Sequence, residues 1–224
     1  MKYSWHGHSV VQLETISGHR IIIDPFINNN PSTDLKVEDI NVDYILLTHG
    51  HNDHVGDTLD IALQNDATVI AMVELADFFE QKGLKTHGMN TGGSYRFPFG
   101  TLKLVPALHS SNYNYNDQSI NMGNPCGLVI DDGVHKVYHA GDTALFSDMK
   151  LIGPVNLAFL PIGDNYTMGI EDAIKAVDFL QCDWAIPIHY NTFPLIRQNP
   201  YDFINRLDEG NGIVPSIGKV YDIN

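Results

Sequence analysis

Cysteine is scarce in this sequence of 224 residues, which contains only Cys126 and Cys182. The two lie far apart and form no CxxC pair, so the sequence favours neither a disulfide framework nor a cysteine zinc site. We expect both side chains to be thiols in the core of a reducing-compartment protein.

Basic residues and long apolar runs are also few. The chain has 13 Lys and Arg against 27 Asp and Glu, which gives a formal net charge of −14. Proteins that bind nucleic acid neutralise phosphates with Lys and Arg, so nucleic acid is disfavoured as the main partner. No apolar run reaches the 18 residues of a membrane span, and none of signal-peptide length follows Met1. We therefore expect a cytoplasmic protein without membrane insertion, and homo-oligomerisation stays open.

Short apolar runs that stop at Asp, Gly, Pro or His alternate with segments of helical spacing. No linker or low-complexity segment interrupts them, so residues 1–224 are expected to form a single α/β domain. Helices are expected around Leu59–Leu63, Leu75–Phe79 and Ile170–Leu180, and from Asn199 to near Gly210. The predicted strands are Val10–Leu13, Arg20–Ile23, Tyr44–Leu47, Thr68–Ala71, Leu102–Val105, Leu128–Ile130, Lys136–Tyr138, Leu157–Leu160 and Ala185–Ile188.

The polar segment Ser110–Asn124 is long for a plain connection. Loops of this length are usually functional or disordered. We expect it either to cover the functional site or to form an interface.

Histidine is the residue type that stands out, with 11 copies. The densest group lies in Thr48–His54, directly after a predicted strand. His49 and His51 are two residues apart and project to the same side of an extended backbone. Asp53 and His54 would then supply a second set of ligands, which predicts two adjacent metal ions.

Three more metal-capable residues follow predicted strands in the same way, each at the first polar position past an apolar run. They are His109, Asp142 and His189. Strand ends at one edge of a sheet sandwich lie close together, so five histidines and two aspartates can converge. Nitrogen and oxygen ligands of this kind suit zinc, with manganese, iron or nickel as alternatives.

The HxHxDH pattern, followed by a lone His, a lone Asp and a final His, resembles the metallo-β-lactamase superfamily along essentially the whole chain. Within it, the sequence is similar to hydrolases related to L-ascorbate-6-phosphate lactonase and to N-acylphosphatidylethanolamine phospholipase D. The resemblance implies a four-layer αββα sandwich with the metals at one edge. The segments that carry the finer likeness are Trp5–Ser9, Ile23–Pro25, Ala140–Thr143 and His189–Phe193.

The resemblance also implies a distribution of ligands. His51 stands where the flavodiiron branch has Glu, which favours hydrolysis over redox chemistry. Antibiotic-degrading members often have Cys at the position of Asp142, so β-lactamase activity is not expected. The implied ligands are His49, His51 and His109 for the first metal, and Asp53, His54 and His189 for the second, with Asp142 bridging.

The expected function is that of a dinuclear metal-dependent hydrolase, in which a metal-bridging hydroxide attacks a lactone, ester or phosphoester. Two cations leave such a centre weakly positive, so a small polar or anionic substrate is expected. Asp53 and His8 are candidate catalytic residues, although His8 could equally be a core histidine. The candidates for orienting a ligand or contacting substrate, with turn formation or packing as the alternative, are Asp24, Tyr190, Asn191 and Asn165.

Two other functions stay open. A phosphodiesterase or nuclease of the same fold would need a basic track, and none is visible in the sequence. A non-catalytic metal-binding scaffold would not need all seven ligands. Metal content measured together with turnover of simple esters separates these alternatives.

Overall fold

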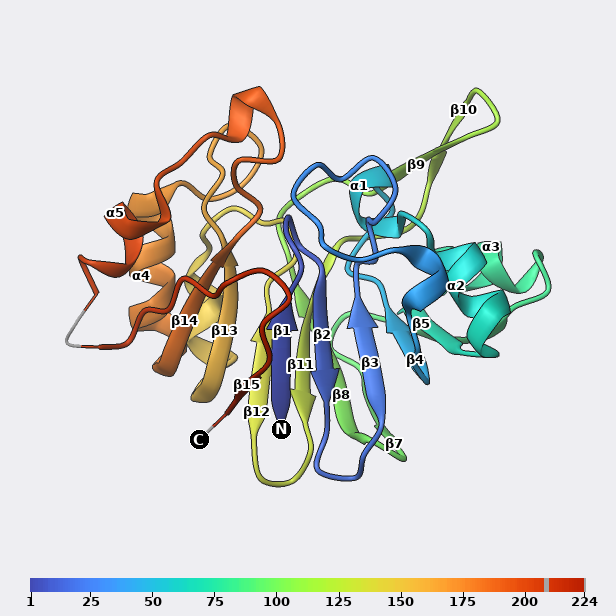
Figure 1. Cartoon of the computed structure of the whole chain (residues 1–224), viewed down its shortest axis with the longest axis horizontal. Helices are drawn as coiled ribbons and strands as arrows, with labels where there is room; N and C mark the ends of the chain where they lie inside the picture. Colours follow the sequence, from blue (N-terminus) through green and yellow to red (C-terminus); the bar gives the residue numbers. More distant parts are fainter. Residues whose placement is uncertain (208–209, 224) are drawn as a thin grey trace.

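The computed structural model describes residues 1–207 and 210–223. Two β-sheets stack face to face, and helices lie on the outer side of each (Figure 1). This arrangement confirms the expected α/β sandwich of four layers.

The first sheet has seven strands. Its first three pairings are antiparallel, and β3 to β6 run parallel. In spatial order the strands are β15 (Tyr221–Asp222), β1 (Lys2–Trp5), β2 (Val11–Glu14), β3 (Arg20–Ile23), β4 (Tyr44–Leu46), β5 (Thr68–Met72) and β6 (Lys85–Met89).

The second sheet has six strands. The three at one side run parallel and the others are antiparallel. In spatial order they are β14 (Cys182–Ile188), β13 (Val155–Pro161), β12 (Lys136–His139), β11 (Cys126–Asp131), β8 (Gly100–Pro106) and β7 (Ser94–Phe97).

The core explains why the predicted strands are apolar on both faces. Ile21 and Ile23 point between the two sheets, whereas Ile22 points outward beneath the helices, and all three are fully buried. A strand covered on both sides reads as a continuous apolar run. All nine predicted strands are found in the structure. The strands that the sequence did not reveal are β1, β6, β7, β9 (Asn112–Tyr115), β10 (Gln118–Asn121) and β15, most of which are short, polar or at an edge.

The helices cover the outer faces of the sheets. Those near the first sheet are α1 (Asn52–Val55), α2 (Thr58–Asn65) and α3 (Val73–Glu80), and those near the second are α4 (Ile170–Leu180) and α5 (Pro200–Ile204) (Figure 1). Short 3-10 turns are η1 (Val37–Asp39), η2 (Ser147–Leu151) and η3 (Pro194–Ile196). No helix in these described residues is both long and apolar enough to cross a membrane.

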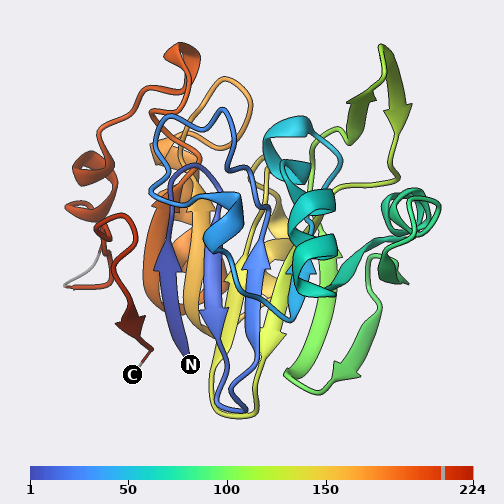
Figure 2. The ribbon, with the colours of Figure 1, turned by 45° about the vertical axis from the view of Figure 1, so that its right-hand side comes forward.

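The expectation of a loop over Ser110–Asn124 was wrong, because most of this segment is the β9–β10 hairpin. Asn116 and Asp117 at its tip both have positive φ, the conformation that a tight hairpin turn requires and that Asn and Asp tolerate. Tyr113 and Tyr115 pack edge-on against Phe78 of α3. The hairpin stands away from both sheets (Figure 2).

The last helix is shorter than expected. It begins at Pro200 with Asn199 as N-cap, as predicted, but ends at Ile204 and not near Gly210. After the helix the chain returns to the edge of β14, where Ile213 N donates a hydrogen bond to Ala185 O at 3.0 Å. Residues 208–209 lie outside the described residues.

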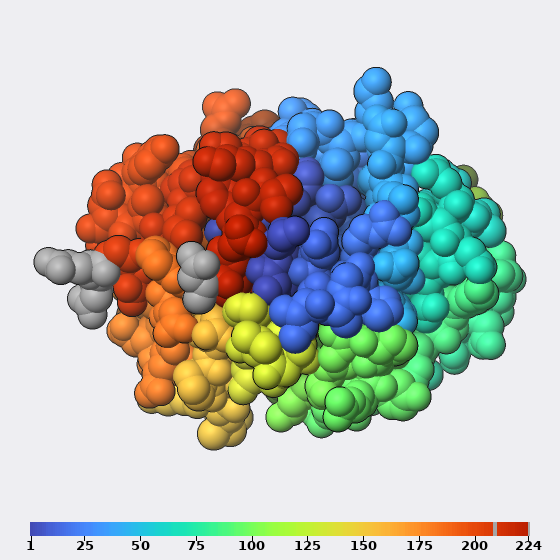
Figure 3. Space-filling view, turned by 60° about the horizontal axis from the view of Figure 1, so that its bottom comes forward, coloured from blue at the N-terminus to red at the C-terminus, as the bar shows by residue number. Residues whose placement is uncertain are grey.

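The end of the sandwich seen in Figure 3 is closed by hairpin turns from both sheets. The β2–β3 turn meets the β11–β12 turn, where Ile16 N donates to Asp132 Oδ2 at 3.2 Å. The functional residues gather at the other end.

Candidate metal centre

The carboxyl ends of strands from both sheets meet at one edge of the sandwich, at the top of Figure 1. Because parallel strands end at the same edge, residues far apart in sequence come together there. The loop after β4 carries His49 and His51, and the short helix α1 that follows it carries Asp53 and His54. His109, Asp142 and His189 follow β8, β12 and β14, and His8 follows β1.

The first group of ligand-type side chains is His49, His51, His109 and Asp142, whose ligand atoms all lie within 4.8 Å of one another. Nε2 of His49 is 3.0 Å from Nδ1 of His51, and Nε2 of His109 is 3.3 Å from the same atom. Three imidazole nitrogens thus converge on one point, where a single cation could accept lone pairs from all of them.

The second group is His8, Asp53, His54 and His189, also within 4.8 Å of one another. His8 Nε2 donates to Asp53 Oδ2 at 3.1 Å. The sequence placed Asp53, His54 and His189 together but left the role of His8 open. The signal that was missed is β1: had it been recognised, His8 would have followed a strand as the other candidate ligands do.

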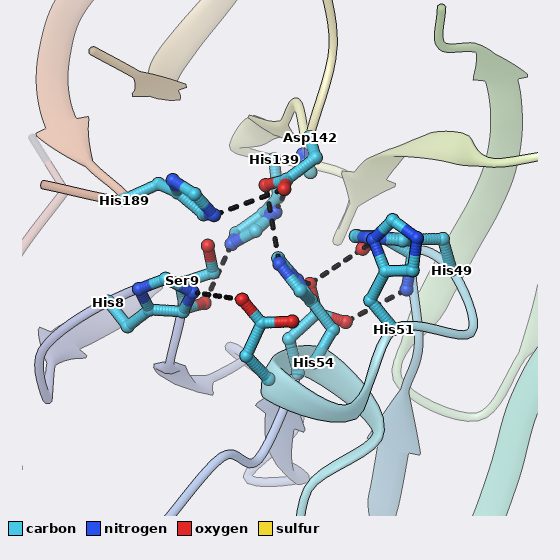
Figure 4. A network of polar contacts seen from close by, with 12 residues as sticks. His8, Ser9, His49, His51, His54, His139, Asp142 and His189 are labelled. Carbon is cyan, nitrogen blue, oxygen red and sulfur yellow. Dashed lines mark hydrogen bonds and ion pairs between the residues drawn. The ribbon is translucent and has the colours of Figure 1, made fainter. Parts of the chain in front are cut away.

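Asp142 lies between the two groups. One oxygen is 3.3 Å from His54 Nε2, and the other is 3.0 Å from His189 Nε2 and 3.5 Å from His109 Nε2. Figure 4 shows its carboxylate above His54, with His189 on one side. This is the position that a bridging ligand needs.

Several of these buried atoms lack hydrogen bonds, although buried polar groups are nearly always paired. They are His54 Nε2, His189 Nε2 and Asp142 Oδ1, whose approaches do not have hydrogen-bond geometry. Divalent metal ions would satisfy all three, so the residues present fit a metal centre.

Side chains around the site fix the orientation of two of the rings. Asp24 Oδ2 accepts from His54 Nδ1 at 2.8 Å and from Thr48 Oγ1 at 2.6 Å. Thr48 Oγ1 in turn lies 3.0 Å from His49 Nδ1. Both histidines therefore turn Nε2 toward the site, an arrangement typical of metal-bound imidazoles.

The outer contacts of His8 and His51 come from other loops. Thr192 Oγ1 lies 2.9 Å from His8 Nδ1, and Ser110 Oγ lies 3.2 Å from His51 Nε2. Thr192 stands in the loop after β14, so it ties that loop to the N-terminal segment.

Burial lowers the pKa of most of these histidines, because a buried imidazolium loses its hydration. The pKa of His8 is lowered to about 4. The rings are therefore neutral at neutral pH, which is the form that binds metals. The other histidines of the site with a lowered pKa are His49, His51 and His109.

His54 differs. Burial alone would lower its pKa, but the carboxylates of Asp142 and Asp24 outweigh burial and hold its pKa well above the usual value. Burial opposes charge on Asp142 too, yet His189 and His54 keep its pKa well below the usual value. The pocket thus attracts positive charge between its carboxylates, as a cation site does.

The backbone at the site is held in an uncommon conformation. His8, Asp24 and His189 have φ values of 53°, 47° and 54°, in the left-handed region that residues other than glycine rarely adopt. Such positions cost about 1–3 kcal/mol each and tend to gather at functional sites. Here they aim the three side chains at the point where the strands end.

The remaining candidates for substrate contact lie elsewhere. Tyr190 is buried and stacks on Trp5, so it packs in the core. Asn165 and Asn191 are exposed and have positive φ, which Asn tolerates, and they shape the loops after β13 and β14. None of the three lines the cavity over the metal site in the described chain.

A cavity of about 690 Å³ opens above the ligand-type residues. Its floor, formed by the ligand-type residues, is polar, and one wall is apolar. The lining residues are His51, Asp53, His109, Ser110, Asp142, Tyr166, His189, Phe193, Pro194 and Leu195.

Comparison with known proteins identifies the family. The model of the beta-lactamase superfamily domain matches residues 19–190. The chain belongs to the metallo-β-lactamase superfamily. A UPF0173 metal-dependent hydrolase from Bacillus cereus (strain AH187) is 53% identical over 224 residues, which cover 98% of each chain. Another from Anoxybacillus flavithermus (strain DSM 21510 / WK1) is 53% identical over 227 residues and the full length of both.

The solved structures agree with this superfamily assignment. Igni18, a metallo hydrolase from Ignicoccus hospitalis, superposes with a TM-score of 0.89 at 35% identity, covering 100% of this chain and 99% of that one. The chain is thus a metal-dependent hydrolase of the metallo-β-lactamase superfamily. The finer resemblance to the lactonase and phospholipase D branch stays a prediction.

Proposed function

We propose that this protein is a dinuclear hydrolase that cleaves a lactone, ester or phosphoester. The observation that carries the proposal is the pair of four-residue groups joined at Asp142 on the floor of a cavity. His49, His51 and His109 would hold one metal, and Asp53, His54 and His189 the other, with Asp142 shared. A pair of divalent ions of this kind, most simply zinc, would supply a water of lowered pKa and polarise the scissile bond.

The protein's own groups complete the site. Asp53 lines the cavity and accepts a hydrogen bond from His8, so a proton on His8 Nε2 lies one hydrogen bond from the cavity. Thr192 holds the other nitrogen of the ring. We therefore assign Asp53 and His8 as the pair that holds a proton beside the reacting group.

The first test is the metal content of protein purified without chelators, with hydrolysis of simple esters measured in parallel. We expect about two ions per chain and turnover that chelation abolishes. His109→Ala removes a ligand of the first group and should lower both metal content and rate, at least tenfold for the rate. His19→Ala, in the distant β2–β3 turn, is the control. Full metal content and full turnover in His109→Ala would refute the ligand assignment, and bound metal without turnover would favour a scaffold.

A further inference from the structure

The cavity over the metal site has two unlike walls. The five ligand-type residues form its floor, and four large side chains with apolar surface form what we call the apolar wall. Those four are Tyr166, Phe193, Pro194 and Leu195. Pockets that bind small molecules have this character, with a mostly apolar lining and a few polar groups that fix orientation.

Two neighbouring loops build the apolar wall. The loop after β13 carries Tyr166, and the loop after β14 carries Phe193 and η3. Ile196 is fully buried and anchors η3, so the wall is not a loose tip. The Phe193 ring packs edge-on against His8, with ring centroids 5.4 Å apart. The apolar wall is therefore in contact with the ligand-type residues at Phe193.

Large apolar side chains at the rim are exposed to solvent. Leu195 is 64% exposed and Tyr166 is 52% exposed. Exposed apolar surface that is continuous with a functional cavity commonly marks a binding surface, because a ligand that covers it releases ordered water. The continuity with the floor indicates that the occupant is part of a molecule whose reactive group lies over the metals.

Charge decides which molecules fit. The described residues that line the cavity include Asp53 and Asp142 but no Lys or Arg. Arg197 is exposed and lies two residues beyond Leu195, outside the lining. A phosphate or carboxylate on the apolar part of a substrate would thus lose hydration without gaining a partner.

Building on the proposed function, we infer that the substrate is an ester or lactone with an uncharged apolar chain of several carbons, which lies on Phe193, Leu195 and Tyr166. The reaction is hydrolysis at the acyl carbon. The oxygen of water forms a bond to that carbon, the bond from the acyl carbon to the leaving oxygen breaks, one proton of water goes to the leaving oxygen and the other is released. A lactone yields a single hydroxy acid.

The test uses the metal-loaded protein and three 4-nitrophenyl esters: acetate, butyrate and hexanoate. A methylene that becomes fully buried improves binding about fourfold. Since this wall is partly open, we expect kcat/KM to rise at least tenfold from acetate to hexanoate. The 4-nitrophenyl monoester of adipic acid has the same acyl length with a terminal carboxylate, and it should fall at least tenfold below hexanoate. Bis(4-nitrophenyl) phosphate serves as the phosphodiester probe.

A matched pair of variants locates the effect. Leu195→Ser removes an apolar side chain of the wall and should lower the hexanoate-to-acetate ratio at least threefold. Leu151→Ser changes a leucine that is still more exposed, at 79%, and lies away from the cavity, and it should leave the ratio unchanged. Hexanoate itself, as a product, should inhibit more strongly than acetate does.

The outcomes separate the two proposals. If no ester or phosphodiester is hydrolysed in a metal-dependent way, the proposed function fails. Hydrolysis of esters with a kcat/KM that does not depend on chain length would support the proposed hydrolase but overturn the apolar substrate. Preference for the adipate monoester or for the phosphodiester would have the same meaning. A ratio that Leu195→Ser leaves unchanged overturns the placement of the chain.

Discussion

At the scale of single residues, the site depends on side chains that do not themselves face the cavity. Asp24 is fully buried and accepts hydrogen bonds from His54 Nδ1 and from the backbone and side chain of Thr48. The sequence suggested two roles for Asp24, ring orientation or turn formation, and its position supports the first. Its role could not be decided from sequence because His54 lies 30 residues away and meets it only in the folded chain.

Replacing this carboxylate should weaken metal binding more than it disturbs the fold. We expect Asp24→Asn to lower metal affinity about 10–100-fold, because the amide keeps the size of the side chain but loses the charge that orients and polarises His54. Titration of chelator-treated protein with zinc measures the affinity, and thermal unfolding without metal measures the fold. Asp66→Asn, at an exposed ion pair with Lys85, is the control. An unchanged zinc affinity would show that Asp24 has only a structural role.

At the scale of elements, the apolar pattern of the sequence predicted the strands that are buried on both faces. It missed strands whose side chains are exposed on one face or both. The nine predicted strands lie in the middle of the sheets or carry strong apolar runs, whereas most side chains of β6 and β7 are exposed or only half-buried. The β9–β10 hairpin was expected to be a loop because the segment is long and rich in Asn, Tyr and Ser, and its tyrosines pack on Phe78 of α3. A polar strand with a few aromatic residues can be recognised only when the surface on which those residues pack is known.

Helix α4 illustrates an element whose role the sequence predicted well. Its apolar face is buried against the second sheet, and Leu180 at its end is fully buried. Leu180→Ala should lower the free energy of unfolding by about 2–5 kcal/mol, through lost burial and the cavity left behind. Leu63→Ala on α2 should change it by less than about 0.5 kcal/mol, because Leu63 lies on the predicted apolar face but is 61% exposed in the structure. Urea unfolding of both variants measures the difference, and equal losses would contradict this account of the packing.

At the scale of the whole molecule, the two sheets are joined at one end by the site itself. His8 and His54 come from the first sheet and its connections, while Asp142 and His189 come from the second. Metal ions held by all of them would link the sheets, so they would bind the folded chain more tightly than the unfolded one. Stability should therefore depend on metal occupancy, by about 2.7 kcal/mol when the free metal is 100 times its dissociation constant.

Removal of the metal should also expose the pH dependence of the fold. Folding lowers the pKa values of His8, His49, His51 and His109. As the pH falls, these side chains therefore bind protons in the unfolded chain before they do so in the folded one. Their contribution to stability is present above about pH 6.5 and is lost as the pH falls toward 4. His54 acts in the opposite direction, but it is one group against four.

We therefore expect chelation to lower Tm by several degrees at pH 7.5, and the Tm of the metal-free protein to fall further between pH 7 and pH 5. Differential scanning calorimetry with and without zinc measures both effects. A metal-free Tm that rises on acidification would contradict the assigned pKa directions.

The sequence by itself determined most of the strands and the seven ligand-type residues, because buried strands are apolar on both faces and each candidate ligand follows one, while the four-layer sandwich was implied by the resemblance that these ligands carry. Only the tertiary structure decided that His8 joins Asp53, His54 and His189, that Asp24 holds His54, and that Phe193 and Leu195 form an apolar wall over the site. The reason is physical: strand and helix patterns arise from neighbours along the chain, whereas these contacts join loops from different strands, whose paths no local pattern specifies.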